Sequence, residues 1–368
     1  MVNTINIFKE AIKKNRILII SVSLFVTATE IFTGIMRYNL HYDEIGAADF
    51  WGNIFFRIFA LVAGTILAYF FCGLLNNELS GIFAVITTVL TVVTSTLEKG
   101  YGYDKCYNIC VVLALLSLSF YYMNSCISSF KHTVCYYIIV TVLAAATVDK
   151  IEFFIVLVVV LLMVASSKTL IKVKSVLIVN GICAVVAIAA MTCAVVDRMD
   201  AYLGIVYIEG YVIHPERVLL SSQIFGSSEY FGEIADAPSM YNLAKIFGYF
   251  GSIPGAVMSV MIAMFVASVG VKCFGGSSQT KSERLVAATI ISIRCFAGFF
   301  ENFSIISGLY SGIPVLSEGS CGYFVLGILL GAILAPCENV ESMKGIFKSL
   351  LGREAENDYN ESEEYDYV

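Results

Sequence analysis

The sequence predicts an all-α polytopic membrane protein, and three observations lead to this prediction. Apolar residues make up 58% of the 368-residue chain and charged residues only 14%, with a mean hydropathy of +0.82, whereas soluble domains are about a quarter charged. The charged residues cluster between long uncharged runs. The net charge of -6 offers no basic face to a nucleic acid. Together these features exclude a soluble enzyme, a disulfide-rich scaffold and a nucleic-acid-binding protein.

About ten segments are apolar enough to be transmembrane helices, since a helix needs about 20 mainly apolar residues to cross the hydrocarbon core. They cover roughly residues 16–36, 52–76, 80–98, 106–124, 132–148, 151–166, 173–195, 246–270, 285–307 and 322–336. The fifth and sixth are short and are separated only by Asp149-Lys150, which requires a tight hairpin. Residues 1–336 are therefore predicted to form a single transmembrane domain.

The positive-inside rule favours an orientation with both termini in the cytoplasm. That orientation places twice as many Lys and Arg residues in cytoplasmic segments as in outer ones, and the reverse orientation inverts this bias. Residues 337–368 then form a cytoplasmic tail. From about residue 352 the tail is acidic and has no apolar periodicity, which is typical of disorder.

Cysteine and histidine residues give no sign of a metal site. The 11 cysteines are scattered without any CxxC or Cys/His spacing, and the 3 histidines are far apart in the sequence. We predict that the cysteines serve as small apolar filler.

The longest segment between predicted spans is the outer loop 196–245, between the seventh and eighth helices. Its charged residues include Arg198, Arg217, Glu233, Asp236 and Lys245. Connections of this length are usually functional or disordered. Because apolar residues recur through this one, we predict that it folds back onto the bundle as short amphipathic helices. A solvated loop with a few caps and ion pairs is the alternative.

Four charged residues fall inside predicted spans, which is costly and seldom incidental. At 1.5 Å per residue, Glu30 lies about 9 Å below the outer end of the first span and Arg57 about 8 Å below the outer start of the second. We therefore predict a Glu30–Arg57 ion pair. Arg294 lies near mid-membrane in the ninth span, and Glu301 is two turns further out on the same face. These four residues either lock helices together or line an outward-opening polar cavity that could hold an anionic headgroup.

The last third of the chain carries a recognisable succession of motifs. Asn302-Phe-Ser-Ile-Ile-Ser-Gly308 leads into Gly312-Ile-Pro314-Val-Leu-Ser317-Glu-Gly319-Ser320 and then into a glycine-spaced apolar span. This succession resembles the signature of the SEDS family (shape, elongation, division and sporulation; the FtsW/RodA/SpoVE proteins). Four earlier stretches resemble the loop motifs of the same family: Asp197-Arg198, Ser221-Ser-Gln-Ile-Phe-Gly226, Phe231-Gly232 and Tyr249-Phe-Gly251-Ser-Ile-Pro-Gly255.

The resemblance implies peptidoglycan synthesis at the outer face of a bacterial cytoplasmic membrane, during division, elongation or sporulation. Glycan strands would be polymerised from lipid II, beside a penicillin-binding protein transpeptidase and in contact with membrane lipid. A loop carboxylate would be the general base, with Asp236 and Glu233 as catalytic candidates. Loop cations, or a divalent cation such as Mg²⁺, would stabilise the leaving diphosphate. Candidate substrate-binding residues are Arg198, Arg217, Lys245, Glu30, Arg57, Arg294, Glu301, Ser317 and Glu318.

One departure from the family pattern affects this interpretation. Counting back from Gly251, the position of the family's catalytic aspartate holds Met240. Asp236 is the nearest carboxylate, and four residues correspond to about 6 Å on a helix. Three alternatives to an active polymerase therefore stay open: a non-catalytic scaffold partner of a penicillin-binding protein, a flippase for lipid-linked precursors, and a polysaccharide polymerase of the O-antigen type. The intramembrane charges are the best support for the flippase.

Overall fold

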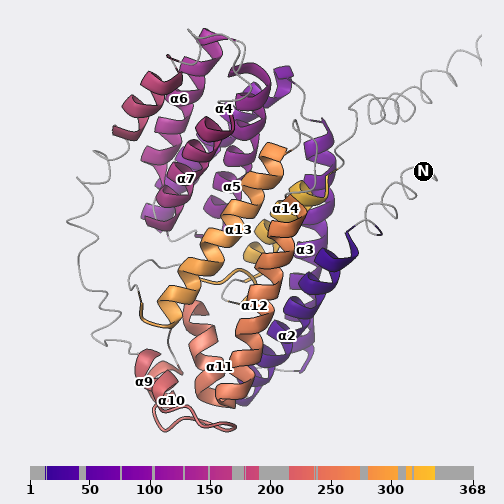
Figure 1. The fold of residues 1–368 in the computed structure, drawn as a ribbon. Helices are drawn as coiled ribbons and strands as arrows, with labels where there is room; N and C mark the ends of the chain where they lie inside the picture. The colour runs from indigo at the N-terminus through magenta and orange to yellow at the C-terminus, as the bar shows by residue number, and fades with distance from the viewer. Residues whose placement is uncertain are drawn as a thin grey trace, which may run out of the picture.

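The computed structural model (Figure 1) describes residues 13, 15–40, 47–74, 77–101, 104–126, 129–147, 150–167, 178, 180–189, 215–235, 237, 239–273, 281–305, 312–316 and 319–335. Every regular element within these ranges is helical, with no strand. The predicted cytoplasmic tail, residues 337–368, lies outside them. The chain is an all-α polytopic membrane protein, as the sequence predicts.

Each of the ten predicted spans coincides with helical structure. The membrane-length and shorter apolar helices are α2 (Arg16–Leu40), α3 (Ala47–Leu74), α4 (Asn77–Tyr101), α5 (Asp104–Tyr121), α6 (Phe130–Ala146), α7 (Lys150–Ser167), α12 (Ser252–Cys273), α13 (Lys281–Asn302) and α14 (Ser320–Leu334). A helix over Asn180–Ala189 lies within the predicted seventh span. Among the described residues, 6 helices are long and apolar enough to cross a membrane, and four more are apolar but shorter. The orientation, with both termini inside, stays a prediction.

The predicted eighth span, 246–270, is wrong in one respect: it is not a single helix. The chain forms α11 (Asn242–Phe250) and α12, which meet at Gly251 with φ +104. A side chain at Gly251 would be strained at this φ, and its Cβ would lie 2.7 Å from the carbonyl oxygen of Ile224. Pro254 lies in the first turn of α12, where a proline is tolerated. The break therefore has a local cause, a glycine in the left-handed region before a helix that accepts proline near its start.

Helix α14 runs between α13 and α3 (Figure 1) and packs most extensively against α3. Glycines allow this close approach, since a Cβ on Gly64 would collide with the carbonyl oxygen of Phe324, and one on Gly327 with that of Leu61. Gly331, four residues after Gly327, is as tightly placed. Small residues at this spacing are how membrane helices bring their backbones close together.

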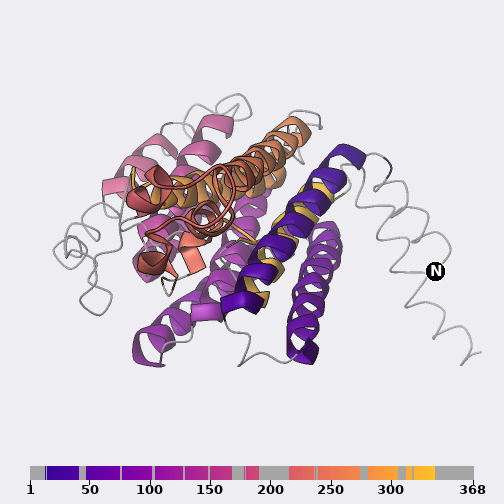
Figure 2. The ribbon, with the colours of Figure 1, turned by 90° about the horizontal axis from the view of Figure 1, so that it is seen from below.

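Short helices gather at one end of the bundle, where α2 ends and α12 begins (Figure 2, which views the bundle from that end). They are α9 (Pro215–Leu220), α10 (Phe231–Ile234), the 3₁₀ turn η2 (Ser239–Tyr241) and α11. Their apolar side chains form a small core with Met36 of α2: Val218, Phe231, Ile234 and Ala244. The prediction that the outer loop folds back as short helices is confirmed over its described part.

Candidate functional site

The segment Ser239–Lys245, which we call the anchored segment, is held by the end of α13. The Asn302 side chain is fully buried. Its amide nitrogen donates to the carbonyl oxygens of Met240 and Gly298, both at 2.7 Å, and its oxygen accepts from the Ala244 backbone N–H at 3.0 Å. One asparagine of α13 thus binds two backbone groups of the anchored segment, the Met240 carbonyl and the Ala244 N–H.

Two more side chains complete the attachment. The Tyr241 hydroxyl donates to Glu301 Oε1 at 3.3 Å, and the Asn242 amide donates to the Leu316 carbonyl at 2.6 Å. Glu301 is one of the four charged residues predicted inside the spans, and it is only 2% exposed. Its buried carboxylate accepts the hydrogen bond that holds Tyr241 of the anchored segment. Leu316 belongs to the loop 312–316, which places a second stretch of the family-like signature against the same segment.

The loop 312–316 is itself tightly constrained. Val315 is buried and has φ +73, a conformation that a β-branched residue rarely adopts. A Cβ on Gly298 would lie 2.6 Å from the backbone nitrogen of Ile313, so α13 and this loop touch through backbone. Strained residues of this kind persist only where their surroundings fix them, and they cluster at functional sites.

Lys245 ends the anchored segment and is buried at 7% exposure. Its ammonium donates to the carbonyl oxygens of Ala235 at 2.9 Å and Ala237 at 2.5 Å. The cation therefore binds the backbone on either side of residue 236. Asp236 itself lies outside the described residues.

Two other loop candidates, Glu233 on α10 and Arg217 on α9, have exposed side chains. Arg198, Ser317 and Glu318 lie outside the described residues, as Asp236 does.

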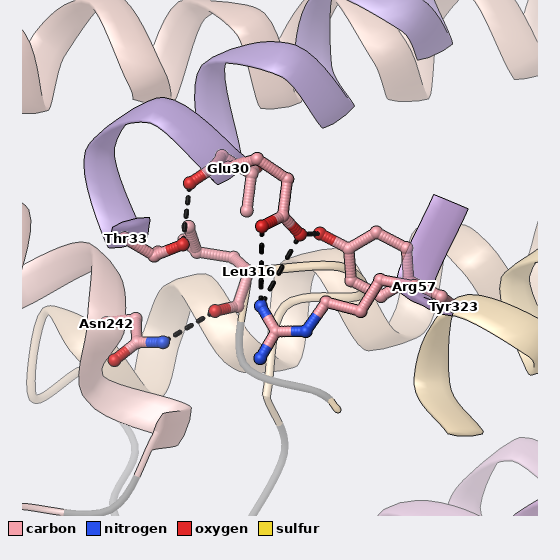
Figure 3. A network of polar contacts seen from close by, with 7 residues as sticks. Glu30, Thr33, Arg57, Asn242, Leu316 and Tyr323 are labelled. Atoms are coloured by element: carbon pink, nitrogen blue, oxygen red, sulfur yellow. Dashed lines mark hydrogen bonds and ion pairs between the residues drawn. The ribbon is translucent and has the colours of Figure 1, made fainter. Parts of the chain in front are cut away.

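The predicted Glu30–Arg57 ion pair is present and buried (Figure 3). Arg57 Nη1 lies 3.4 and 3.5 Å from the two carboxylate oxygens of Glu30. The Tyr323 hydroxyl of α14 also donates to Glu30, and the Arg57 guanidinium stands 5.9 Å from the centroid of the Tyr323 ring. This cluster ties α2, α3 and α14 together, and Figure 3 shows it beside the Asn242–Leu316 contact of the anchored segment.

Arg294 has partners that sequence reasoning did not find. It pairs with Glu152 of α7 at 2.5 Å and donates to Asn108 of α5 at 3.3 Å. Glu152 stands at the start of a short predicted span, two residues after Lys150, and so resembles a loop residue in the sequence. A count of helical depth does not find the pair, because it puts Glu152 at the end of its span and Arg294 near mid-membrane.

The four predicted intramembrane charges have separate partners. Glu30 is paired with Arg57, Arg294 is paired with Glu152, and Glu301 accepts from Tyr241; each of these charged residues is buried. A transport path needs polar groups that line an open passage. The closed pairs count against the flippase alternative.

The family-like loop motifs also meet in space. The stretch Ser221–Gly226 lies against the junction of α11 and α12: Ser252 N donates to the Gln223 carbonyl at 2.7 Å, and Gly226 N donates to the Phe250 carbonyl at 3.0 Å. These are the two stretches in which the sequence resembles the loop motif and the start of the eighth helix. Their contact attaches Ser221–Gly226 to α11 and α12, and α11 also contains the last residues of the anchored segment.

Within the described residues, no group of three or more His, Cys, Asp or Glu side chains is placed to hold a metal ion. The divalent cation that the family resemblance allows stays a prediction. The cationic side chains in the described part of the site are Lys245 and, on the exposed surface, Arg217.

Neither a protein-family model nor a curated protein matches this sequence. Solved structures do match its fold. One is an aspartate-to-alanine mutant of the rod shape determining protein RodA from Thermus thermophilus, similar over 86% of this chain and 95% of that chain, with 11% sequence identity and a TM-score of 0.50. Another comes from a peptidoglycan synthase complex that coordinates polymerization and crosslinking, with 12% identity, the same 86% and 95% coverage and a TM-score of 0.50.

The chain thus has the fold of RodA. The likeness to the SEDS family is confirmed at the level of the fold, and with 86% of the chain covered it reaches beyond residues 197–336 into the first half. In that half the sequence resembles the family only in the pattern of its spans.

Proposed function

We propose that this chain is a SEDS-type protein of peptidoglycan synthesis that polymerises glycan strands from lipid II at the outer membrane face. The observation that carries the proposal is the anchored segment. Asn302 and Leu316, from stretches that resemble the family signature, and Glu301, which directly precedes the first stretch, hold the segment at the position where the resemblance places the catalytic aspartate. A general base must be held within hydrogen-bond reach of the proton that it removes, and a segment attached at three points supplies that rigidity.

The proposed reaction is a glycosyl transfer. A loop carboxylate, Asp236 or Glu233, removes the proton of the acceptor sugar 4-hydroxyl, and the oxygen attacks the anomeric carbon of the donor sugar. The bond between that carbon and the diphosphate oxygen breaks, and the polyprenyl diphosphate leaves with the electron pair. Arg198, Arg217 and Lys245 are the proposed cations for the leaving diphosphate.

Lys245 supports Asp236 over Glu233 as the base. Its ammonium binds the carbonyls of the residues on both sides of Asp236, whereas Glu233, three residues earlier on α10, has an exposed side chain. The Glu30–Arg57 cluster lies beside the anchored segment (Figure 3) and is proposed to face the diphosphate-bearing end of the lipid.

A second function is favoured by one observation, the presence of Met240 at the aspartate position. A methionine cannot act as a base, so the chain would be a non-catalytic scaffold that keeps the fold for a penicillin-binding protein. The RodA-like structure from a peptidoglycan synthase complex supports a partner of this class.

Purified protein in lipid bilayers should be given lipid II and assayed for glycan chains, with and without a penicillin-binding protein. We expect product from the wild type, loss of product in Asp236→Asn, and a smaller effect of Glu233→Gln. Glu229→Gln is the matched control, because Glu229 is an exposed carboxylate of the same outer segment. Absence of product from the wild type in both settings, together with binding of the transpeptidase, would replace the polymerase with the scaffold.

A further inference from the structure

The turn Ser221–Ser228, between α9 and α10, exposes two adjacent apolar side chains. Ile224 is 68% exposed and Phe225 is 65% exposed. No charged residue occurs between Arg217 and Glu229, so the turn is uncharged throughout. Exposed apolar residues that lie together mark contact with a membrane or a partner.

Backbone hydrogen bonds fix this turn to the start of α12. Ser252 N donates to the Gln223 carbonyl at 2.7 Å, and Ile253 N donates to the Ile224 carbonyl at 3.3 Å. Gly251 lies so close that a Cβ there would be 2.8 Å from Phe225 Cα. The two apolar side chains are therefore held at a fixed place relative to the helix.

The length of α12 gives the depth of that place. Its 22 residues correspond to about 33 Å of helix, at 1.5 Å per residue, and the hydrocarbon core of a bilayer is about 30 Å thick. The first turn of α12 thus marks one boundary of the membrane. Ile224, whose carbonyl is bonded to that turn, and its neighbour Phe225 therefore lie close to the boundary.

Helix α12 also exposes one apolar face along its length. Ile253, Val257, Val260 and Met264 follow each other at intervals of four, three and four residues, and each is more than two-fifths exposed. This spacing puts them on one side of the helix, which faces lipid in a polytopic protein. Ile253 at the top of this stripe is the residue whose backbone bonds to Ile224.

We infer that Ile224 and Phe225 insert into the leaflet at which α12 begins and anchor the outer segment to the lipid surface. Lipid is favoured over a protein partner because the pair continues a lipid-facing stripe and its neighbours are small uncharged residues, such as Ser222 and Ser227. Large apolar side chains such as phenylalanine and leucine are the ones that interfacial segments bury at the boundary between headgroups and acyl chains. This lipid contact of Ile224 and Phe225 sets the height of α10 and of Ser239–Lys245 above the membrane. The inference does not depend on the proposed catalytic function.

Depth-dependent fluorescence quenching tests this inference. The chain has 1 tryptophan, so Trp51→Phe gives a silent background in which Phe225→Trp is the only reporter. In nanodiscs of brominated phospholipid, we expect blue-shifted emission from Phe225→Trp, loss of intensity through the bromine atoms, and protection from aqueous iodide. Glu229→Trp in the same background is the matched control, and we expect red-shifted emission with quenching by iodide.

Two outcomes would overturn the inference. One is quenching of Phe225→Trp by iodide to the same extent as the Glu229→Trp control, with no effect of brominated lipid, which would place the turn in water. The other is protection that appears only after addition of a penicillin-binding protein, which would make the turn a protein-docking surface. Thermal unfolding of each variant, compared with the Trp51→Phe background, shows whether the variant is folded. If Phe225→Trp does not fold, Ile224→Trp provides a second reporter.

Discussion

Asn302 donates a hydrogen bond to the carbonyl of Met240, the residue at which the family resemblance leads us to expect a catalytic aspartate. The end of α13 therefore holds the backbone of this position, which carries a methionine. A backbone held in this way is compatible with a displaced base or with a scaffold, and the predictions below test the hydrogen bonds and the chemistry separately.

Replacement of Asn302 by leucine should destabilise the protein strongly. The change leaves the Ala244 N–H and the Met240 carbonyl buried without their partner, and each such loss costs about 1–3 kcal/mol. We expect a lower thermal midpoint and faster amide exchange over residues 239–245. Asn39→Leu is the matched control, since Asn39 makes one exposed hydrogen bond to Tyr249, and equal effects of the two variants would contradict the role of Asn302.

Replacement of Gly327 by alanine should separate α3 from α14. The added methyl group collides with the Leu61 carbonyl, and overpacking of this kind costs about 1–3 kcal/mol. Because Arg57 and Tyr323 lie on these two helices, the Glu30 cluster should loosen as well. Gly270→Ala on α12 is the control, since nothing lies within 4 Å of its Cβ position; thermal unfolding in bilayers should show no loss there.

The Arg294–Glu152 pair should behave as a buried ion pair. Loss of one partner leaves an uncompensated buried charge, and Arg294→Met alone should cost about 3–5 kcal/mol. The double variant Arg294→Met/Glu152→Leu should recover much of that loss, because well-packed apolar residues can replace both charges. A double-mutant cycle from unfolding free energies measures the coupling; simple additivity would show that the two side chains act independently.

Lys245→Met should release the backbone around residue 236. The variant keeps the length of the side chain but removes the donor for the Ala235 and Ala237 carbonyls. We expect hydrogen exchange to accelerate over residues 235–241 while α13 stays protected. Lys131→Met, at an exposed position, should leave the pattern as in the wild type. Unchanged exchange in Lys245→Met would mean that the ammonium does not order this part of the chain.

Met240→Asp tests whether the anchored segment can support a base, and it rests on the proposed function. General base catalysis contributes about 10²–10⁴-fold to a rate. In the Asp236→Asn background, Met240→Asp should restore glycan polymerisation by a factor in that range, because Met240 is half-buried at the segment held by Asn302. Met240→Asn provides the same shape without the base and should stay inactive. Equal activity of the two variants would argue against a base at this position.

The fold and one ion pair follow from the sequence because they depend on simple spacing. Apolar run length predicts the spans, and equal depth on consecutive antiparallel helices predicts Glu30–Arg57, which is present. The break at Gly251 was missed because the run 246–270 is apolar throughout. Gly251 followed by Pro254 was the available signal for a helix that ends and another that begins.

The rest of the site depends on contacts between distant parts of the chain. Tyr323 carries no charge and lies in an apolar helix, so its bond to Glu30 could not be seen before α2 and α14 were placed side by side. Glu152 was hidden at the end of a short span. The hydrogen bonds from Asn302 to Met240 and from Asn242 to Leu316 join backbone carbonyls, which every residue has and which no sequence pattern distinguishes.

The attachment of the anchored segment also determines when the site can form during synthesis. Met240, Tyr241 and Asn242 bind partners that lie further along the chain, in α13 and the loop 312–316. Since a chain is made from its N-terminus, the segment leaves the ribosome before any of these partners exists. Completion of the site must therefore wait for the synthesis of α13 and the loop 312–316. A chain interrupted before that point would lack the partners that hold residues 240–242.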